Sequence, residues 1–353
     1  MSERVLTRRE LNRALLARQL LLEREAIPVP RAVERLAGLQ AQYPPTPYLS
    51  LWSRVDGLAR EDLTRALERR RLVKALLMRG TLHLVTPRDY WAFATARREL
   101  GGVLWPPSYE RIVASKRLAE LAEIALTELR DEPRTLKQML ATLAPHARGK
   151  VTPAFLWRRI QGHAHVVHVP PSGTWGFHKD PPYAAADSWI PGEPPPSEDA
   201  FDQLVSRYLA AFGPATARDV AQWAGVPRIK PINASLERLK LRTFLDERGR
   251  VLHDLPRAPR PDPETPAPVR LVPRFDNLVL SHDDRTRVLG DVPVTTIVTK
   301  NAIVHAIFLV DGFVAGTWEL ERGRVVLEPF GRLAPSVRRE LKEESDRLAD
   351  WAA

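Results

Sequence analysis

The chain of 353 residues contains no cysteine. This excludes disulfides, thiolate nucleophiles and cysteine-ligated zinc or iron–sulfur clusters. Long hydrophobic runs are also missing, since no window reaches the roughly 18 uncharged apolar residues that a membrane span needs. The first residues, MSERVLTRREL, have no apolar segment behind their charges. We therefore expect neither a secretory signal nor a membrane anchor, and a cytoplasmic location.

Several motifs that would indicate a cofactor are absent as well. There is no glycine-rich phosphate loop, no dinucleotide fingerprint and no H-E-x-x-H, so nucleotide hydrolysis, hydride transfer and zinc proteolysis find no support. Three histidines, His163, His165 and His168, lie close together but lack carboxylates or cysteines at ligand spacing. We expect no metal site and no cofactor.

Positive charge, in contrast, is abundant. The chain carries 53 Lys and Arg against 43 Asp and Glu, a formal net charge of +10. Residues 1–100 contain 19 of these cations and 11 of the acids, so most of the excess lies in the first third of the chain. Nearly all of these cations are arginines, whose planar fork suits phosphate groups. The composition favours a polyanionic partner.

Hydrophobic periodicity predicts an α+β fold of three tandem winged-helix modules followed by a small C-terminal β domain. In the first module, residues 1–100, we expect helices at about 7–24, 33–40 and 60–70, then a hairpin with strands at 72–78 and 81–85. The second helix is expected to end near Gln40-Ala41-Gln42, because three prolines follow within five residues. Three helices followed by a hairpin is the order of a winged helix.

The same order recurs twice. The second module, 101–190, has predicted helices at 108–129, 134–143 and 152–162 and wing strands at 166–169 and 175–177. The third, 196–256, has predicted helices at 199–212, 216–224 and 232–239 and strands at 243–245 and 251–255. Proline-rich stretches at 191–197 and 256–268 separate the modules. The C-terminal domain, 268–353, has predicted strands at 269–280, 294–298, 303–309, 313–320 and 324–327 and a helix at 334–350. The alternative for each module is a small helical bundle with an attached hairpin.

Three segments carry a resemblance to a known family. They are Gln40-Ala41-Gln42, the run RGTLHLV at 79–85 and the run RFDNLVLSHDDR at 274–285. Together, and with GFVAGTW at 312–318, they resemble the winged-helix DNA glycosylases of the AlkZ family, over about residues 5–330. The resemblance implies a monofunctional DNA glycosylase that excises N7-alkylated purines, including those in interstrand crosslinks. It implies that Gln40 and Gln42 are catalytic, with Ala41 smaller than the family's usual aliphatic residue.

The chemistry of the two amides agrees with such a substrate. An amide cannot serve as an ordinary general base near neutral pH, so the pair can only hold and orient a water. A purine alkylated at N7 is already cationic and leaves without being protonated, which makes positioning and electrostatics sufficient. We expect neutral lesions such as uracil or hypoxanthine to be poor substrates. The alternative for Gln40 and Gln42 is that they only end a surface helix.

The remaining expectations concern DNA. We expect a monomer that binds double-stranded DNA with alkylated purines or crosslinks, with no protein partner implied, in an open groove-lining site rather than a tight base pocket. The candidate DNA contacts are Arg69, Arg70, Arg71, Arg79, His83, Arg274, Asn277, His282 and Arg285. The acidic residues at 276–284 are equally able to form ion pairs with Arg285 and Arg287. The main rival function is a non-enzymatic winged-helix regulator that reads base edges with a helix near 231–240.

Overall fold

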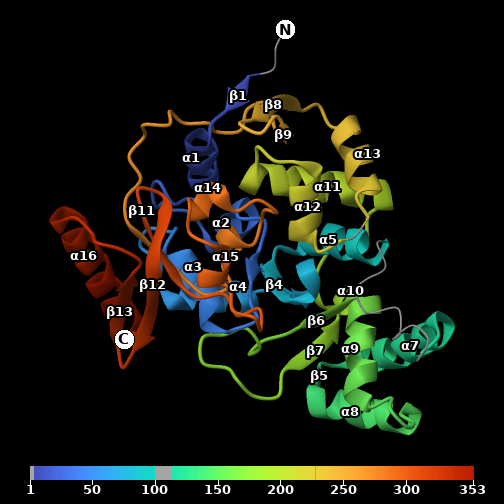
Figure 1. Cartoon of the computed structure of the whole chain (residues 1–353). Coiled ribbons are helices and arrows are strands. Elements are labelled where there is room, and N and C mark those ends of the chain that lie inside the picture. Colours follow the sequence, from blue (N-terminus) through green and yellow to red (C-terminus); the bar gives the residue numbers. More distant parts are fainter. Residues whose placement is uncertain (1–3, 100–112, 227) are drawn as a thin grey trace.

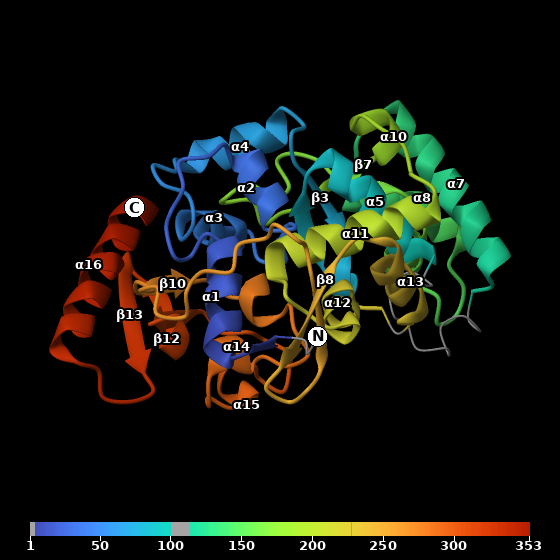
Figure 2. The same ribbon diagram turned by 90° about the horizontal axis from the view of Figure 1, so that it is seen from above.

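The computed structural model describes residues 4–99, 113–226 and 228–353. Helices and strands alternate irregularly along the chain, and the strands form three separate sheets, with orders β1-β8-β9, β10-β11-β12-β13 and β2-β4-β3-β6-β7-β5. The predicted α+β class is confirmed. In Figures 1 and 2, α7 and α8 lie at one end of the molecule and α16 and β13 lie at the other, with the first and third predicted modules between them.

The first predicted module differs from expectation around Gln40. Its elements after the N-terminal helix α1 (Arg8–Arg18) are α2 (Val29–Arg35), β2 (Leu39–Gln40), α3 (Pro45–Trp52), α4 (Arg60–Glu68), β3 (Val73–Leu76), the 3-10 turn η1 (Met78–Gly80), β4 (Leu82–Val85) and α5 (Pro87–Glu99). The second helix therefore ends at Arg35, and Gln40 belongs to a short strand. The prolines that we expected to stop a helix begin α3 instead, because proline is compatible with a first helical turn.

The second predicted module shares a sheet with the first. Its elements are α7 (Ser115–Asp131), β5 (Arg134–Thr135), α8 (Leu136–Leu143), η2 (Ala144–His146), α9 (Pro153–His163), β6 (Val166–His168), β7 (Pro182–Ala185) and α10 (Ala186–Trp189). Strand β6 pairs with β3 through Lys74 and His168, which makes one continuous sheet. The predicted wing strand at 175–177 is wrong, since Trp175 and Gly176 lie in a turn and the second neighbour of β6 in the sheet is β7. Residues 108–112 of the predicted long helix lie outside the described residues.

The third predicted module has its elements where the sequence placed them. They are α11 (Ser197–Phe212), α12 (Ala217–Ala224), α13 (Lys230–Arg238), β8 (Arg242–Asp246) and β9 (Val251–Asp254). Thr216 and Asp219 form a reciprocal cap on α12, and Gly225 ends it in a left-handed conformation. The N-terminal strand β1 (Val5–Leu6) adds to β8 in parallel, and α1 packs against α11. The first residues of the chain thus join the third module.

The C-terminal region holds fewer strands than predicted. Its elements are β10 (Arg270–Val272), the 3-10 turn η3 (Asn277–Val279), α14 (Thr286–Leu289), α15 (Val294–Ile297), β11 (Ile307–Val310), β12 (Phe313–Glu321), β13 (Arg324–Pro329) and α16 (Pro335–Ala352). The predicted strand at 269–280 stops at Val272, and a turn follows in which Phe275 has a positive φ of 59°. The Asp276 side chain then accepts from the Leu278 N–H and begins η3. The predicted strand at 294–298 is a helical turn. The division into modules at the predicted boundaries stays a prediction.

Candidate active site

Gln40 lies on β2 because the chain reverses sharply after α2. Ala37 and Gly38 both adopt positive φ, at 54° and 90°. A Cβ on Gly38 would lie 2.7 Å from the Val85 side chain, so only glycine fits against β4. Beyond this turn Gln40 pairs with His83 in antiparallel register, and the Ala41 N–H donates to the Leu82 carbonyl at 2.7 Å. The strand thus runs along β4 toward Gln42.

The Gln40 side chain is held by Arg79. Gln40 is only 5% exposed, and its Oε1 accepts a hydrogen bond from Arg79 Nη2 at 3.0 Å. The Arg79 Nη2 also donates to Asn277 Oδ1 at 2.9 Å, and Nη1 donates to the Trp223 carbonyl at 2.9 Å. A single guanidinium therefore connects β2, the β3–β4 hairpin, the end of α12 and η3.

Arg79 has no carboxylate partner among the ion pairs of the described residues. Burial, together with repulsion from Arg285, lowers the pKa of Arg79 to about 10. The group is still protonated at neutral pH, and neutral groups rather than carboxylates provide its hydrogen-bond acceptors. The backbone of Arg79 is equally constrained, because it has φ 54° and lies against Gly225, where a Cβ would approach within 2.4 Å of Arg79 Cα.

His83 completes the buried side of this cluster. Its side chain has no solvent exposure, its Nδ1 lies 3.0 Å from the Thr81 carbonyl and its Nε2 lies 3.3 Å from Arg79 Nη2. Burial and the neighbouring Arg79 cation lower the pKa of His83 to about 3. Since Arg79 can only donate, the neutral imidazole carries its proton on Nδ1 and accepts at Nε2.

Gln42 has a different environment from Gln40. It is exposed, and its Oε1 accepts from the Leu82 N–H at 3.3 Å, near the limit of a hydrogen bond. The next residue, Tyr43, is 46% exposed. The pair thus consists of one fixed, buried amide and one amide at the surface.

Asn277 ties the C-terminal segment to the turn that precedes Gln40. Its Nδ2 donates to the Gly38 carbonyl at 3.1 Å while its Oδ1 accepts from Arg79. Asp276, one residue earlier, forms a buried ion pair with Arg54. The segment at 274–285 therefore contacts both the turn before Gln40 and the Arg79 guanidinium through Asn277.

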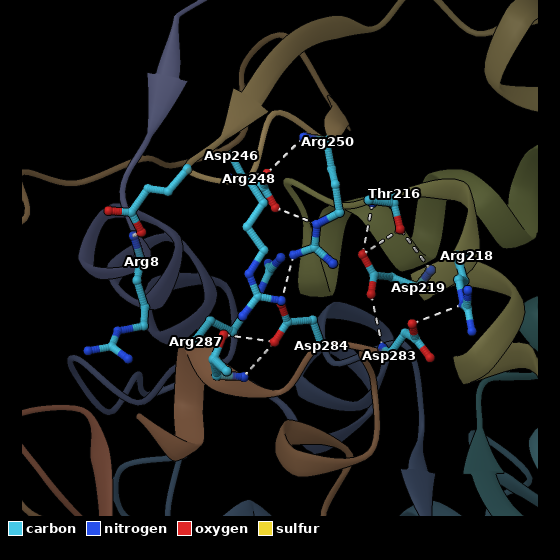
Figure 3. Close-up of polar contacts among 12 residues, drawn as sticks. Arg8, Thr216, Arg218, Asp219, Asp246, Arg248, Arg250, Asp283, Asp284 and Arg287 are labelled. Atoms are coloured by element: carbon cyan, nitrogen blue, oxygen red, sulfur yellow. Dashed lines mark hydrogen bonds and ion pairs between the residues drawn. The ribbon is translucent and has the colours of Figure 1, made fainter. Parts of the chain in front are cut away.

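The acidic residues of this motif form ion pairs with arginines from other elements, and no ion pair among the described residues joins them to Arg285 or Arg287. Figure 3 shows Asp283 with Arg218, and Asp284 with Arg248 and Arg250. Asp283 pairs with Arg218 at 2.9 Å, and its N–H donates to Asp219 on α12. Asp284 pairs with Arg248 and Arg250 of the β8–β9 hairpin at 2.9 and 2.7 Å. These contacts hold Asp283 and Asp284 between α12 and the β8–β9 hairpin.

The other predicted DNA contacts divide into exposed and buried residues. Arg69, Arg70 and Arg71 are exposed between α4 and β3, with the Arg70 guanidinium stacked 3.8 Å from the Trp189 ring centroid. Arg274 is half-exposed and pairs with Glu319, and Arg285 is partly buried.

Three of the predicted contacts have their side chains inside the protein. His83, Asn277 and His282 are buried, and His282 Nε2 lies 3.0 Å from the Phe212 carbonyl. In this conformation they present no surface to DNA.

Sequence reasoning predicted Arg79 as a DNA contact and missed its contact with Gln40. The four groups around this guanidinium come from residues 40, 83, 223 and 277, and no local pattern joins such distant positions. Among the described residues, no three His, Asp or Glu side chains are placed to hold a metal ion. Nor does that part of the chain contain a helix long and apolar enough to cross a membrane.

Comparison with known proteins gives a consistent family assignment. A family model described as "DNA glycosylase AlkZ-like" matches residues 33–351. The chain belongs to this family and is a DNA glycosylase, an enzyme that hydrolyses N-glycosyl bonds.

A curated relative and a solved structure come from one organism. The "Interstrand DNA cross-link repair glycosylase" of Streptomyces sahachiroi is 25% identical over 325 residues, which cover 84% of each chain. The structure of S. sahachiroi DNA glycosylase AlkZ matches with a TM-score of 0.83 and 21% identity, over 99% of this chain and 97% of that one. The likeness to that structure shows that the two proteins share a fold.

Proposed function

We propose that this glycosylase excises N7-alkylated purines from double-stranded DNA, including purines in interstrand crosslinks, and that Gln40 and Gln42 place the attacking water beside C1′. Crosslink repair is supported by the name of the S. sahachiroi relative. The assignment of Gln40 and Gln42 rests on the family motif and on their position at the end of β2.

The observation that carries this proposal is the absence of a carboxylate from the contacts of either glutamine within the described residues. Their side-chain partners are a guanidinium and a backbone N–H, and the neighbouring imidazole is neutral with its Nε2 directed at Arg79. Such a site has no ordinary general base. It suits a leaving group that departs without proton transfer from the enzyme.

An N7-alkylated purine is such a leaving group. The C1′–N9 bond breaks with both electrons moving to the purine, which loses its positive charge. The water oxygen bonds to C1′ and one of its protons passes to solvent. The enzyme contributes by orienting the water and by stabilising the oxocarbenium-like sugar, which requires no proton transfer to the base.

DNA is bound, in this proposal, by a monomer through the exposed arginines at 69–71. These precede β3 and are free of carboxylate ion pairs within the described part of the chain. Their guanidinium groups suit phosphate oxygens.

The test compares release of three bases from otherwise identical duplexes under single-turnover conditions. We expect alkali-sensitive strand breaks with N7-methylguanine and none above background with uracil or hypoxanthine. Gln40→Ala and Gln42→Ala should each abolish the breaks, whereas Gln161→Ala on α9 should leave them unchanged. Rapid release of uracil, or full activity in both alanine variants, would exclude the proposed chemistry.

A further inference from the structure

The orientation of the Gln40 amide follows from the chemistry of its partner. An arginine side chain can only donate hydrogen bonds, so the atom that faces Arg79 Nη2 at 3.0 Å must be the amide oxygen. The Gln40 amino group is thereby turned away from Arg79. Within the described residues that amino group donates no hydrogen bond, since the contact with Arg79 is the one side-chain hydrogen bond of Gln40 there.

Arg79 cannot easily release this oxygen. Its guanidinium is fixed from two other sides by the Trp223 carbonyl and by Asn277 Oδ1. Its backbone is fixed by the close approach of Gly225. A cation held among neutral acceptors loses one of its few solvating groups if Gln40 rotates, and this makes the observed orientation the stable one.

Gln42 has no comparable constraint. The side chain is exposed and its single contact, from the Leu82 N–H, is 3.3 Å long. Rotation of this amide sacrifices at most one weak hydrogen bond. Gln42 can therefore present its oxygen to a ligand, whereas Gln40 presents only its amino group.

We propose that Arg79 is a positioning residue that makes Gln40 a dedicated hydrogen-bond donor, so that Gln42 alone supplies the acceptor of the pair. This inference rests on the proposed function. The Gln40 amino group donates to the oxygen of the attacking water and leaves the second lone pair directed at C1′. The Gln42 oxygen accepts one of the protons of that water. The two glutamines are thus not interchangeable.

Substitution of each glutamine by glutamate separates the two roles. Gln40→Glu keeps an oxygen against Arg79 and replaces the outward amino group by a second acceptor. We expect its single-turnover rate on N7-methylguanine to fall about 100-fold, as for loss of one preorganised donor. Gln42→Glu keeps the acceptor, and we expect its rate to stay within about 10-fold of the parent rate. Affinity for undamaged duplex, measured by fluorescence anisotropy, reports any repulsion between the new charge and DNA.

Thermal stability gives a readout that does not depend on activity. Gln40→Glu places a carboxylate beside the unpaired Arg79 cation, so Tm should rise or stay unchanged, while Gln42→Glu at the surface should leave Tm unaltered. A loss of rate together with a retained or increased Tm is not expected from a merely structural role. Equal losses of rate in the two glutamate variants, or full activity of Gln40→Glu, would overturn the inference.

Arg79→Lys tests the positioning residue itself. A single ammonium cannot span the Gln40, Asn277 and Trp223 oxygens, so we expect a loss of rate with little change in DNA affinity. Arg287→Lys is the matched control, because Arg287 is buried and donates to the Pro214 carbonyl without contacting Gln40. If the two lysine variants lose Tm equally and both keep their rate, Arg79 has no positioning role.

A different result would show that the proposed function, rather than the role of Arg79, is wrong. If the parent enzyme releases no N7-methylguanine, the proposed substrate is wrong. The Tm of Gln40→Glu then still tests the contact with Arg79, since a marked decrease shows that residue 40 does not accept a hydrogen bond from that guanidinium.

Discussion

The buried ion pair behind the site allows a quantitative prediction. Arg54 and Asp276 have side chains that are 1% and 2% exposed. Each Asp276 oxygen accepts two hydrogen bonds, Oδ1 from Arg54 and the Leu278 N–H and Oδ2 from Arg54 and the Ser50 hydroxyl. Asp276→Asn replaces one acceptor by an amino group that faces donors, and it leaves the Arg54 cation buried without a counterion.

The expected cost follows from this geometry. Removal of one partner of a buried ion pair costs about 3–5 kcal/mol. Arg54 retains hydrogen bonds to the Gln19 and Ser50 carbonyls, so we expect the lower end, about 3 kcal/mol. At about 2 °C per kcal/mol for a chain of this size, Tm should decrease by about 6 °C.

Scanning calorimetry and urea denaturation measure the change. The control is Asp346→Asn on α16, which breaks an exposed pair with Lys342 whose side chains are 75% and 60% exposed. Its cost should be close to the limit of measurement, because both side chains are exposed to solvent. If Asp276→Asn costs no more than this control, the buried pair does not stabilise the segment that carries Asn277, and the reasoning is refuted.

Three further predictions follow from the same structure. Gly225→Ala should lower both Tm and the excision rate, because its Cβ would meet the Arg79 backbone. The control is Gly249→Ala, since Gly249 has a similar positive φ but lies in open space; this change should cost about 1 kcal/mol of stability and leave the excision rate unchanged. The free energy of unfolding should fall as the pH decreases below 6.5. The pKa values of His83 and His282 are both lowered to about 3 in the folded state, so in this pH range the unfolded chain binds protons at these two histidines while the folded protein does not. For His83 alone the loss at pH 5 is about 2 kcal/mol, and a stability that is flat from pH 7 to 5 would contradict this. EDTA should leave excision of N7-methylguanine unchanged, as activity assays with and without added Mg²⁺ would show.

The sequence predicted best where local signals agree. The third module combines a capping box, a left-handed glycine and two apolar strand runs, and each of its elements lies where these signals placed it. The prediction failed where a short element depends on distant partners. Strand β2 contains only two residues, and it exists because β4 offers an edge to which Leu39 and Gln40 pair. Periodicity cannot detect so short a strand, and the apolar residues before it therefore predict a continuing helix.

The excess of arginine in the sequence was the least reliable guide to the position of the site, for a physical reason. The excess of arginine in residues 1–100 indicated a phosphate-binding surface, yet the side chains of Arg13, Arg18 and Arg54 are almost fully buried and bind carboxylates and carbonyls within the protein. Arginine has five donors and a long apolar stem, which lets it join segments across an interior as readily as it binds phosphate. Arg79, which is partly buried, joins segments in the same way. A count of cations therefore limits the class of partner but not the position of the interface.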